Sequence, residues 1–198
     1  ETMDQDLSEI VYNELNKLGG LWIYAISGNH DIKKVSRVGN PPYSWLYTVE
    51  RYGIEIIDYT TRILSGYHKE IEVHGVPYID NNIGISKYLS ELKLDKSKKH
   101  ILLLHTDYPG AKDTDGREID SVENLNLNTL NRFDLVLCGH IHKPQRLGKK
   151  VYMIGAPNQQ RRTDKNCKLG YWKIYEDLSM EFVPLKGFPK FKDVESEE

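Results

Sequence analysis

The chain has 198 residues and a mass of 23.0 kDa, which fits one domain with a single buried core. Its 27 lysines and arginines against 29 aspartates and glutamates give a net charge of −2, so bulk positive charge alone does not hold it on nucleic acid. Hydrophobic residues at 39% and charged residues at 28% argue against wholesale disorder. The apolar runs are too short to span a bilayer and no secretory signal is visible, so no membrane partner is expected. Two cysteines make no disulfide framework, which favours a reducing, cytoplasmic location.

Helical and strand-like hydrophobic patterns alternate along the chain. In chain order they predict a helix over 4–18, a strand over 21–26, a helix over 44–52, strand pieces over 54–57, 62–64, 70–74 and 76–79, a helix over 85–94, a strand over 100–105, a helix over 121–131, and strands over 133–138, 151–154, 171–175 and 180–183. Helices that alternate with strands, followed by a run of strands, favour an α/β layered fold with mixed sheets.

Three of the expected buried strands end in polar residues of the same chemical kind. These ends carry, in chain order, Asn29 with His30 and Asp31, then His105, then His140 with His142. Ligand sites of α/β sheets gather beyond the carboxyl ends of strands, and neutral imidazoles with an amide oxygen suit a borderline divalent metal ion. A single histidine at a strand end is more often a capped or solvated residue. Three such ends in this order favour a metal site.

The remaining histidines and the first cysteine have plainer interpretations. His68, His74 and His100 follow no such pattern and are interpreted as ordinary residues. Cys138 precedes Gly139 inside an apolar run, which favours a small core residue over a metal ligand.

The three polar strand ends resemble known sequence motifs. Gly28-Asn29-His30-Asp31, His105 and Gly139-His140-Ile141-His142 are similar to the third, fourth and fifth motifs of the calcineurin-like metallophosphoesterases. The segments 154–157, 169–174 and 180–184 resemble the closing strands of the SbcD-type DNA-repair nucleases. The resemblance covers nearly the whole chain. It implies a layered metallophosphoesterase fold, two mixed β-sheets flanked by helices, over residues 1–188, with a tail over 189–198.

The resemblance also implies a set of metal ligands. Asn29, His105 and His140 would bind the second ion of a two-metal site, and His142 would bind the first. The nuclease branch suggests Mn²⁺, which histidine, asparagine and carboxylate ligands suit without selecting it uniquely. Two such ions activate water and clamp the phosphate oxygens during in-line displacement.

The same motifs imply the acid of the reaction. His30 would not be a ligand but would face the scissile phosphate as general acid or transition-state donor, oriented by Asp31. The serine/threonine phosphatases of the superfamily usually carry glutamate where this chain has Asp31. A histidine beside a carboxylate has its tautomer and proton affinity set by that partner.

Two motifs of the family do not occur before Gly28: Asp-x-His and Gly-Asp-x-x-Asp. They would supply the bridging aspartate and most ligands of the first ion. Because the opening helix resembles the one that follows the second motif, the strands that carry both motifs are expected to lie outside this sequence. The domain over residues 1–188 is therefore expected to be incomplete at its N-terminus.

Basic residues in two segments are expected to flank the metal site. They are Lys33, Lys34 and Arg37 after the Asn-His-Asp turn, and Arg161 and Arg162 in a later polar loop. Both segments are candidates for contacts with a DNA phosphate backbone. A solvated loop is an almost equally good interpretation.

Three functions stay open. The first is the nuclease subunit of an SbcC–SbcD-type complex acting on double-stranded DNA, for which the resemblance implies a coiled-coil ATPase partner and a homodimer. The second is a stand-alone phosphatase or small-molecule phosphodiesterase. The third is a non-catalytic remnant or binding module, for which the absent ligands are the best evidence. We adopt the first as the working hypothesis.

Overall fold

The computed structural model describes residues 9–10, 12–14, 17, 19–34, 39–64, 70–79, 84–120 and 125–192. Its named elements, in chain order, are β1 (Ile23–Ala25), β2 (Ile32–Lys34), β3 (Tyr43–Ser44), the 3₁₀ helix η1 (Trp45–Tyr52), β4 (Ile54–Ile56), β5 (Thr61–Leu64), β6 (Ile71–Val76), α2 (Ile85–Glu91), β7 (Lys99–His105), α3 (Leu127–Leu130), β8 (Leu135–Gly139), β9 (Gln145–Leu147), β10 (Val151–Met153), the 3₁₀ helix η2 (Arg162–Asn166), β11 (Gly170–Ile174) and β12 (Met180–Pro184). In this part of the chain, no helix is long and apolar enough to cross a membrane.

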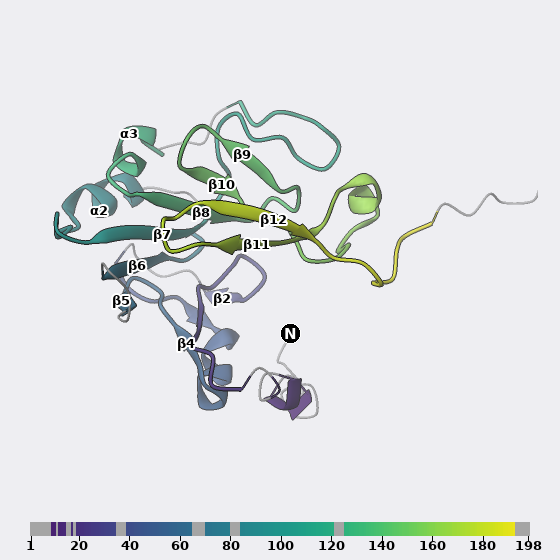
Figure 1. Ribbon diagram of the computed structural model, residues 1–198, viewed down its shortest axis with the longest axis horizontal. Helices are drawn as coiled ribbons and strands as arrows, with labels where there is room; N and C mark the ends of the chain where they lie inside the picture. The colour runs from purple at the N-terminus through teal and green to yellow at the C-terminus, as the bar shows by residue number, and fades with distance from the viewer. Residues whose placement is uncertain are drawn as a thin grey trace, which may run out of the picture.

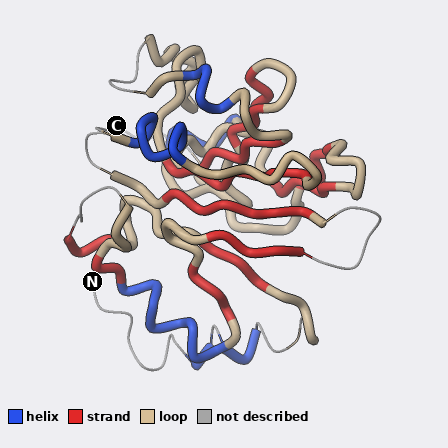
Figure 2. Tube along the Cα trace, turned by 90° about the vertical axis from the view of Figure 1, so that its left-hand side faces the viewer, coloured by secondary structure: helices blue, strands red, loops and turns tan. Residues whose placement is uncertain are grey.

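A six-stranded mixed sheet forms the centre of the molecule (Figure 1). Its strand order is β5-β6-β7-β8-β10-β9, with β6, β7, β8 and β10 parallel and with β5 and β9 antiparallel at the two edges. The central strands β7 and β8 have near-continuous apolar sequences because parallel strands are covered on both faces. Figure 2 shows the strands running through the middle of the molecule.

Side chains that alternate along β7 divide the interior into two layers. Leu102 and Leu104 enter a core cluster that also contains Leu89 of α2, so this face of the sheet is covered by helices. Ile101 packs in the other cluster, against which Trp172 of β11 lies. The β11–β12 hairpin crosses the front of the sheet in Figure 1. The fold is therefore two layers on a central sheet, with helices on one face and strand pairs on the other.

A close backbone approach places the end of β1 at the end of β6. A Cβ on Gly75 would lie 2.1 Å from the carbonyl oxygen of Ile57, so only glycine lets the segment after β4 dock on β6. Beyond it, the Tyr78 amide donates to the Ser27 carbonyl at 2.9 Å. These contacts hold the residues that follow β1 beside the carboxyl end of the sheet, where the candidate metal site lies.

The expected α/β layered fold is confirmed. Among the described residues, its second strand layer consists of two-stranded pairs, β1 with β4 and β11 with β12. The pieces expected at 70–74 and 76–79 form one strand, β6, and the helix expected over 44–52 is the 3₁₀ helix η1. Most of the helix expected over 4–18, and residues 121–124 of another, lie outside the described residues.

Candidate metal centre

Three strand ends bring the predicted metal-binding side chains together. Asn29 follows β1, His105 ends β7, and His140 follows β8. The Asn29 Oδ1 atom lies 3.0 Å from His105 Nε2 and 3.3 Å from His140 Nδ1. In the sequence, Asn29 is 76 residues from His105 and 111 residues from His140. An amide oxygen between two imidazole nitrogens is a set of ligands that suits a divalent cation. The residues therefore fit the ion that the sequence predicts.

Two glycines hold the His105 ring in place. A Cβ on Gly28 or on Gly139 would lie 2.8 Å from atoms of the His105 ring, so both backbones are in close contact with the imidazole. Burial lowers the pKa of His105 to about 4, and the nearby histidines act in the same direction. His105 is therefore neutral near pH 7, with a lone pair available for coordination.

His140 has a strained backbone that aims its side chain at Asn29. Its φ of 95° lies in the left-handed region that non-glycine residues avoid. The ring stacks on Tyr78 with centroids 5.7 Å apart, and its Nε2 lies 3.5 Å from an Asp107 carboxylate oxygen. Burial lowers the pKa of His140, although Asp107 acts in the opposite direction. Strain at this position is consistent with a functional constraint.

His142 lies at the same site and is held by an aspartate that the sequence pattern did not single out. Its Nδ1 is 3.0 Å from Asp164 Oδ2, and this oxygen also accepts from the backbone amides of Gln160 and Arg161. Asp164 is 0% exposed. Burial raises the pKa of Asp164, but these hydrogen bonds outweigh it and the net pKa is lowered. His142 is thus fixed at Nδ1, which leaves Nε2 for a ligand.

The turn after β1 is anchored by two carboxylates. Asp31 Oδ2 accepts from the Gly28 amide at 2.8 Å, and buried Asp58 accepts from both the amide and the hydroxyl of Ser27. Burial raises the pKa of Asp31, while Gly28 and the charge of His30 act against it. Among the described contacts, Asp31 therefore supports the turn and affects His30 through charge. The exposed His30 side chain lines the pocket over the metal-binding residues.

Two neighbouring pockets open over these residues. One, of about 320 Å³, is lined by all six predicted catalytic and metal-binding residues, and the other, of about 270 Å³, lies beside it. His140, His142 and Arg161 line both. Of the predicted phosphate-binding residues, Arg161 lies at the site, whereas Lys33 and Arg162 are exposed and do not line either pocket. The Lys34 side chain and Arg37 lie outside the described residues.

The geometry agrees with a comparison against protein families. The family model described as calcineurin-like phosphoesterase matches residues 3–144. This chain belongs to that family. Calcineurin-like phosphoesterases, as a family, are hydrolases of phosphate esters that bind divalent metal ions.

Two relatives show how far the likeness extends. The chain is 23% identical over 195 residues to the SbcD component of the nuclease SbcCD of Staphylococcus epidermidis, and the match covers 88% of this chain and 52% of that protein. The chain thus spans about half the length of this curated relative. A crystal structure described as a 5'-nucleotidase of Staphylococcus aureus in complex with alpha-ketoglutarate is 13% identical, with a TM-score of 0.48 over 94% of this chain and 41% of that one.

Proposed function

We propose that this phosphoesterase hydrolyses phosphodiester bonds of double-stranded DNA, as the nuclease subunit of an SbcCD-type complex. The observation that carries the proposal is the convergence of Asn29, His105 and His140 at three strand ends, with His142 beside them. The SbcD relative, a subunit of the nuclease SbcCD, supports a nuclease activity and an SbcC-type partner. The resemblance of the sequence motifs implies that this partner is a coiled-coil ATPase, that the complex is a homodimer and that its substrate is double-stranded DNA.

Each residue of the site has a part in this proposal. Asn29, His105 and His140 would hold the second ion of the two-metal site, expected to be Mn²⁺, and His142 would hold the first ion through Nε2. Divalent ions at such a site polarise the phosphoryl oxygens and lower the pKa of water. The other ligands of the first ion would come from the Asp-x-His and Gly-Asp-x-x-Asp motifs, which residues 1–27 do not match.

Two further side chains act on the substrate directly. His30 is exposed on the pocket wall, where its imidazolium would donate a proton to the leaving oxygen of the scissile phosphate. Arg161 lines both pockets, and its positive charge acts to lower the pKa of His140. The guanidinium would therefore bind a phosphate oxygen of the DNA through charge-assisted hydrogen bonds.

The proposal is tested on the intact gene product that contains this chain. Metal-stripped protein is reloaded with Mn²⁺ and assayed on end-labelled linear duplex DNA, on bis-p-nitrophenyl phosphate and on a 5'-mononucleotide. We expect hydrolysis of the duplex and of the model diester, loss of both in EDTA, and loss of both in Asn29→Ala. Asn131→Ala, which changes an exposed asparagine away from the pockets, is the matched control and keeps full activity.

Two results overturn the proposal. Rapid hydrolysis of the mononucleotide without cleavage of duplex DNA would make the protein a phosphatase. Tight Mn²⁺ binding with no hydrolysis of any ester would make it a binding module. Co-purification with an SbcC-type ATPase, measured by size-exclusion chromatography, tests the partner separately from the chemistry.

A further inference from the structure

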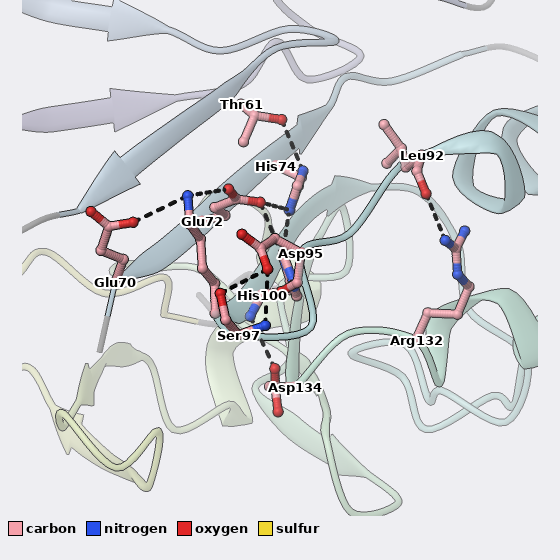
Figure 3. Close-up of polar contacts among 11 residues, drawn as sticks. Thr61, Glu70, Glu72, His74, Leu92, Asp95, Ser97, His100, Arg132 and Asp134 are labelled. Carbon is pink, nitrogen blue, oxygen red and sulfur yellow. Dashed lines mark hydrogen bonds and ion pairs between the residues drawn. The ribbon is translucent and has the colours of Figure 1, made fainter. Parts of the chain in front are cut away.

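A second group of side chains that are of the kinds that bind metal ions lies at the end of the central sheet opposite the phosphoesterase centre. Glu72 and His74 are two residues apart on β6, and Glu72 is the register partner of His100 at the start of β7. The three side chains therefore point to the same face of the sheet (Figure 3). His100 is the second residue of β7, the strand that His105 ends, so five residues, or about 16 Å of extended chain, separate this cluster from the phosphoesterase centre.

The three side chains direct one atom each toward a common point. His74 Nε2 is 3.1 Å from His100 Nδ1, Glu72 Oε2 is 3.4 Å from His100 Nδ1, and Glu72 Oε2 is 3.8 Å from His74 Nε2. Ligands bound to zinc at 2.0–2.1 Å in a tetrahedron lie about 3.3 Å from one another. The spacing of these three atoms matches the edges of such a tetrahedron.

The cluster is buried, and its outer hydrogen bonds fix which atoms face inward. The side chains of His74 and His100 are 4% and 5% exposed, and that of Glu72 is 12% exposed. His100 Nε2 lies 2.9 Å from the Asp95 carbonyl oxygen, which only accepts, so this nitrogen carries the proton. In neutral His100 the lone pair is then on Nδ1, which faces Glu72 Oε2.

This arrangement places two hydrogen-bond acceptors, Glu72 Oε2 and His100 Nδ1, opposite each other in a buried position that is shielded from solvent. A carboxylate oxygen and an imidazole lone pair 3.4 Å apart repel unless a cation or a proton lies between them. Lys98 contacts the other oxygen of Glu72, at 2.9 Å, and so orients the carboxylate without separating the pair. His74 Nδ1 lies 2.9 Å from the Thr61 hydroxyl, which can accept its proton and leave Nε2 as a second inward lone pair.

We propose that Glu72, His74 and His100 bind one divalent transition metal ion, with Zn²⁺ the expected ion, at a structural site separate from the phosphoesterase centre. Two imidazoles and one carboxylate are a donor set that zinc accepts, and the outer hydrogen bonds to Thr61 and Asp95 are the partners that orient ligating histidines. The ion would tie β6 to β7 and to the loop that holds Asp95. It would stabilise the sheet without taking part in hydrolysis.

The test compares three variants of the intact protein after removal of metal with a chelator. Zn²⁺ alone is titrated by calorimetry, Co²⁺ alone is titrated by visible absorption, and the midpoint of thermal unfolding is measured with and without Zn²⁺. Glu72→Gln keeps the size of the side chain and removes its charge. Glu70→Gln removes the other carboxylate that contacts Lys98 and is the matched control. His105→Ala removes a ligand of the phosphoesterase centre.

Beside any Zn²⁺ that enters the phosphoesterase centre, we expect the native protein to bind one Zn²⁺ that Glu72→Gln weakens at least tenfold and that Glu70→Gln and His105→Ala retain. Glu72→Gln should also lose the zinc-dependent rise in the midpoint of thermal unfolding. Because the amide group introduced by Glu72→Gln can donate a hydrogen bond to His100 Nδ1, the metal-free variant should remain folded, so loss of binding would not reflect loss of the fold.

Zinc binding that His105→Ala removes and Glu72→Gln leaves unchanged would assign the ion to the phosphoesterase centre and overturn the proposal. Absence of any zinc-dependent change in the native protein would overturn it as well, and would mean that a proton chain from Thr61 through both histidines to Asp95 fills the site instead. None of these measurements depends on hydrolytic activity, so this inference and the proposed function fail independently.

Discussion

His142 Nδ1 and Asp164 Oδ2 lie 3.0 Å apart, and this pair joins the strand-end motif to the 3₁₀ helix η2, 22 residues later in the chain. The aspartate is fully buried, and its Oδ1 has no hydrogen-bond partner in the part of the chain that the structure describes. Its Oδ2 alone binds His142 and two backbone amides. An imidazole held in this way at one nitrogen presents the other to a metal ion with a fixed orientation and raised basicity.

Asp164→Asn should weaken divalent metal binding without unfolding the protein. The asparagine oxygen can replace Oδ2 as acceptor, and its amide group can occupy the place of the unpartnered Oδ1, so the shape is kept and the charge is lost. Loss of such a partner typically lowers metal affinity or activity about 10- to 100-fold. The loss of affinity is measured from the dependence of the hydrolysis rate on Mn²⁺ concentration. Asp177→Asn, at an exposed aspartate, is the control. An unchanged Mn²⁺ dependence in the folded variant would show that Asp164 does not act through the metal.

His30→Ala should slow hydrolysis while leaving the metal in place. His30 is exposed on the pocket wall, and removal of a general acid typically costs about 10²- to 10⁴-fold in rate. His140→Ala is the contrasting variant, because it removes an imidazole that lies 3.3 Å from the Asn29 oxygen, and it should lower Mn²⁺ affinity. Rates and bound Mn²⁺ are measured on both. A wild-type rate in His30→Ala would remove this residue from the chemistry.

The central sheet could be predicted because its strands are encoded locally. The runs 100–105 and 133–138 are apolar over enough residues to identify buried strands, and the predicted metal-binding residues lie at their ends or just beyond them. Strands such as β9 (Gln145–Leu147) could not be found in this way. It is polar, lies at the edge of the sheet and exists because it pairs with β10. Cys138, expected in the core, is fully buried there.

The residues that sequence reasoning missed depend on contacts between distant segments. Asp164 lies among basic and polar residues, and no local pattern relates it to His142. The proposed zinc site has no local pattern either: strand register places Glu72 opposite His100 and gathers both side chains with His74 in the interior. Register between parallel strands is a property of the folded sheet, and neither strand carries it alone.

Gly28→Ala should disturb the metal centre through His105. The new methyl group would lie 2.8 Å from the His105 ring, and the ring cannot move away freely because it is also packed close to Gly139, where an added Cβ would lie 2.8 Å from its Nδ1 atom. Overpacking of this kind typically costs about 1–3 kcal/mol of stability. We expect weaker Mn²⁺ binding and a lower unfolding midpoint. Gly148→Ala is a poor control because its φ is positive, so Ala156→Ser near the same pocket serves instead. Native Mn²⁺ affinity in Gly28→Ala would show that the ring tolerates displacement.

Acid should destabilise the metal-free protein in part through His74. The pKa of this histidine is about 4 in the folded chain against 6.5 for an ordinary histidine, because it is buried and faces His100. Since the unfolded state takes up the proton first, the stabilising contribution is complete above about pH 6.5 and is lost as the pH falls toward about 4. The free energy of unfolding should fall by up to about 1.4 kcal/mol per pH unit from this one group, or about 3 kcal/mol in all.

Urea unfolding in the presence of EDTA, at pH values from 7.5 to 4.5, measures this dependence in the native protein and in His74→Gln. Glutamine does not titrate, so the variant should have a shallower dependence on pH even if its stability at pH 7.5 is lower. Asn131→Ala changes an exposed residue that does not titrate and should keep the native slope. Parallel curves for the native protein and His74→Gln would mean that His74 takes up its proton equally in both states, and that the acid sensitivity arises from other groups such as His105, whose pKa burial also lowers to about 4.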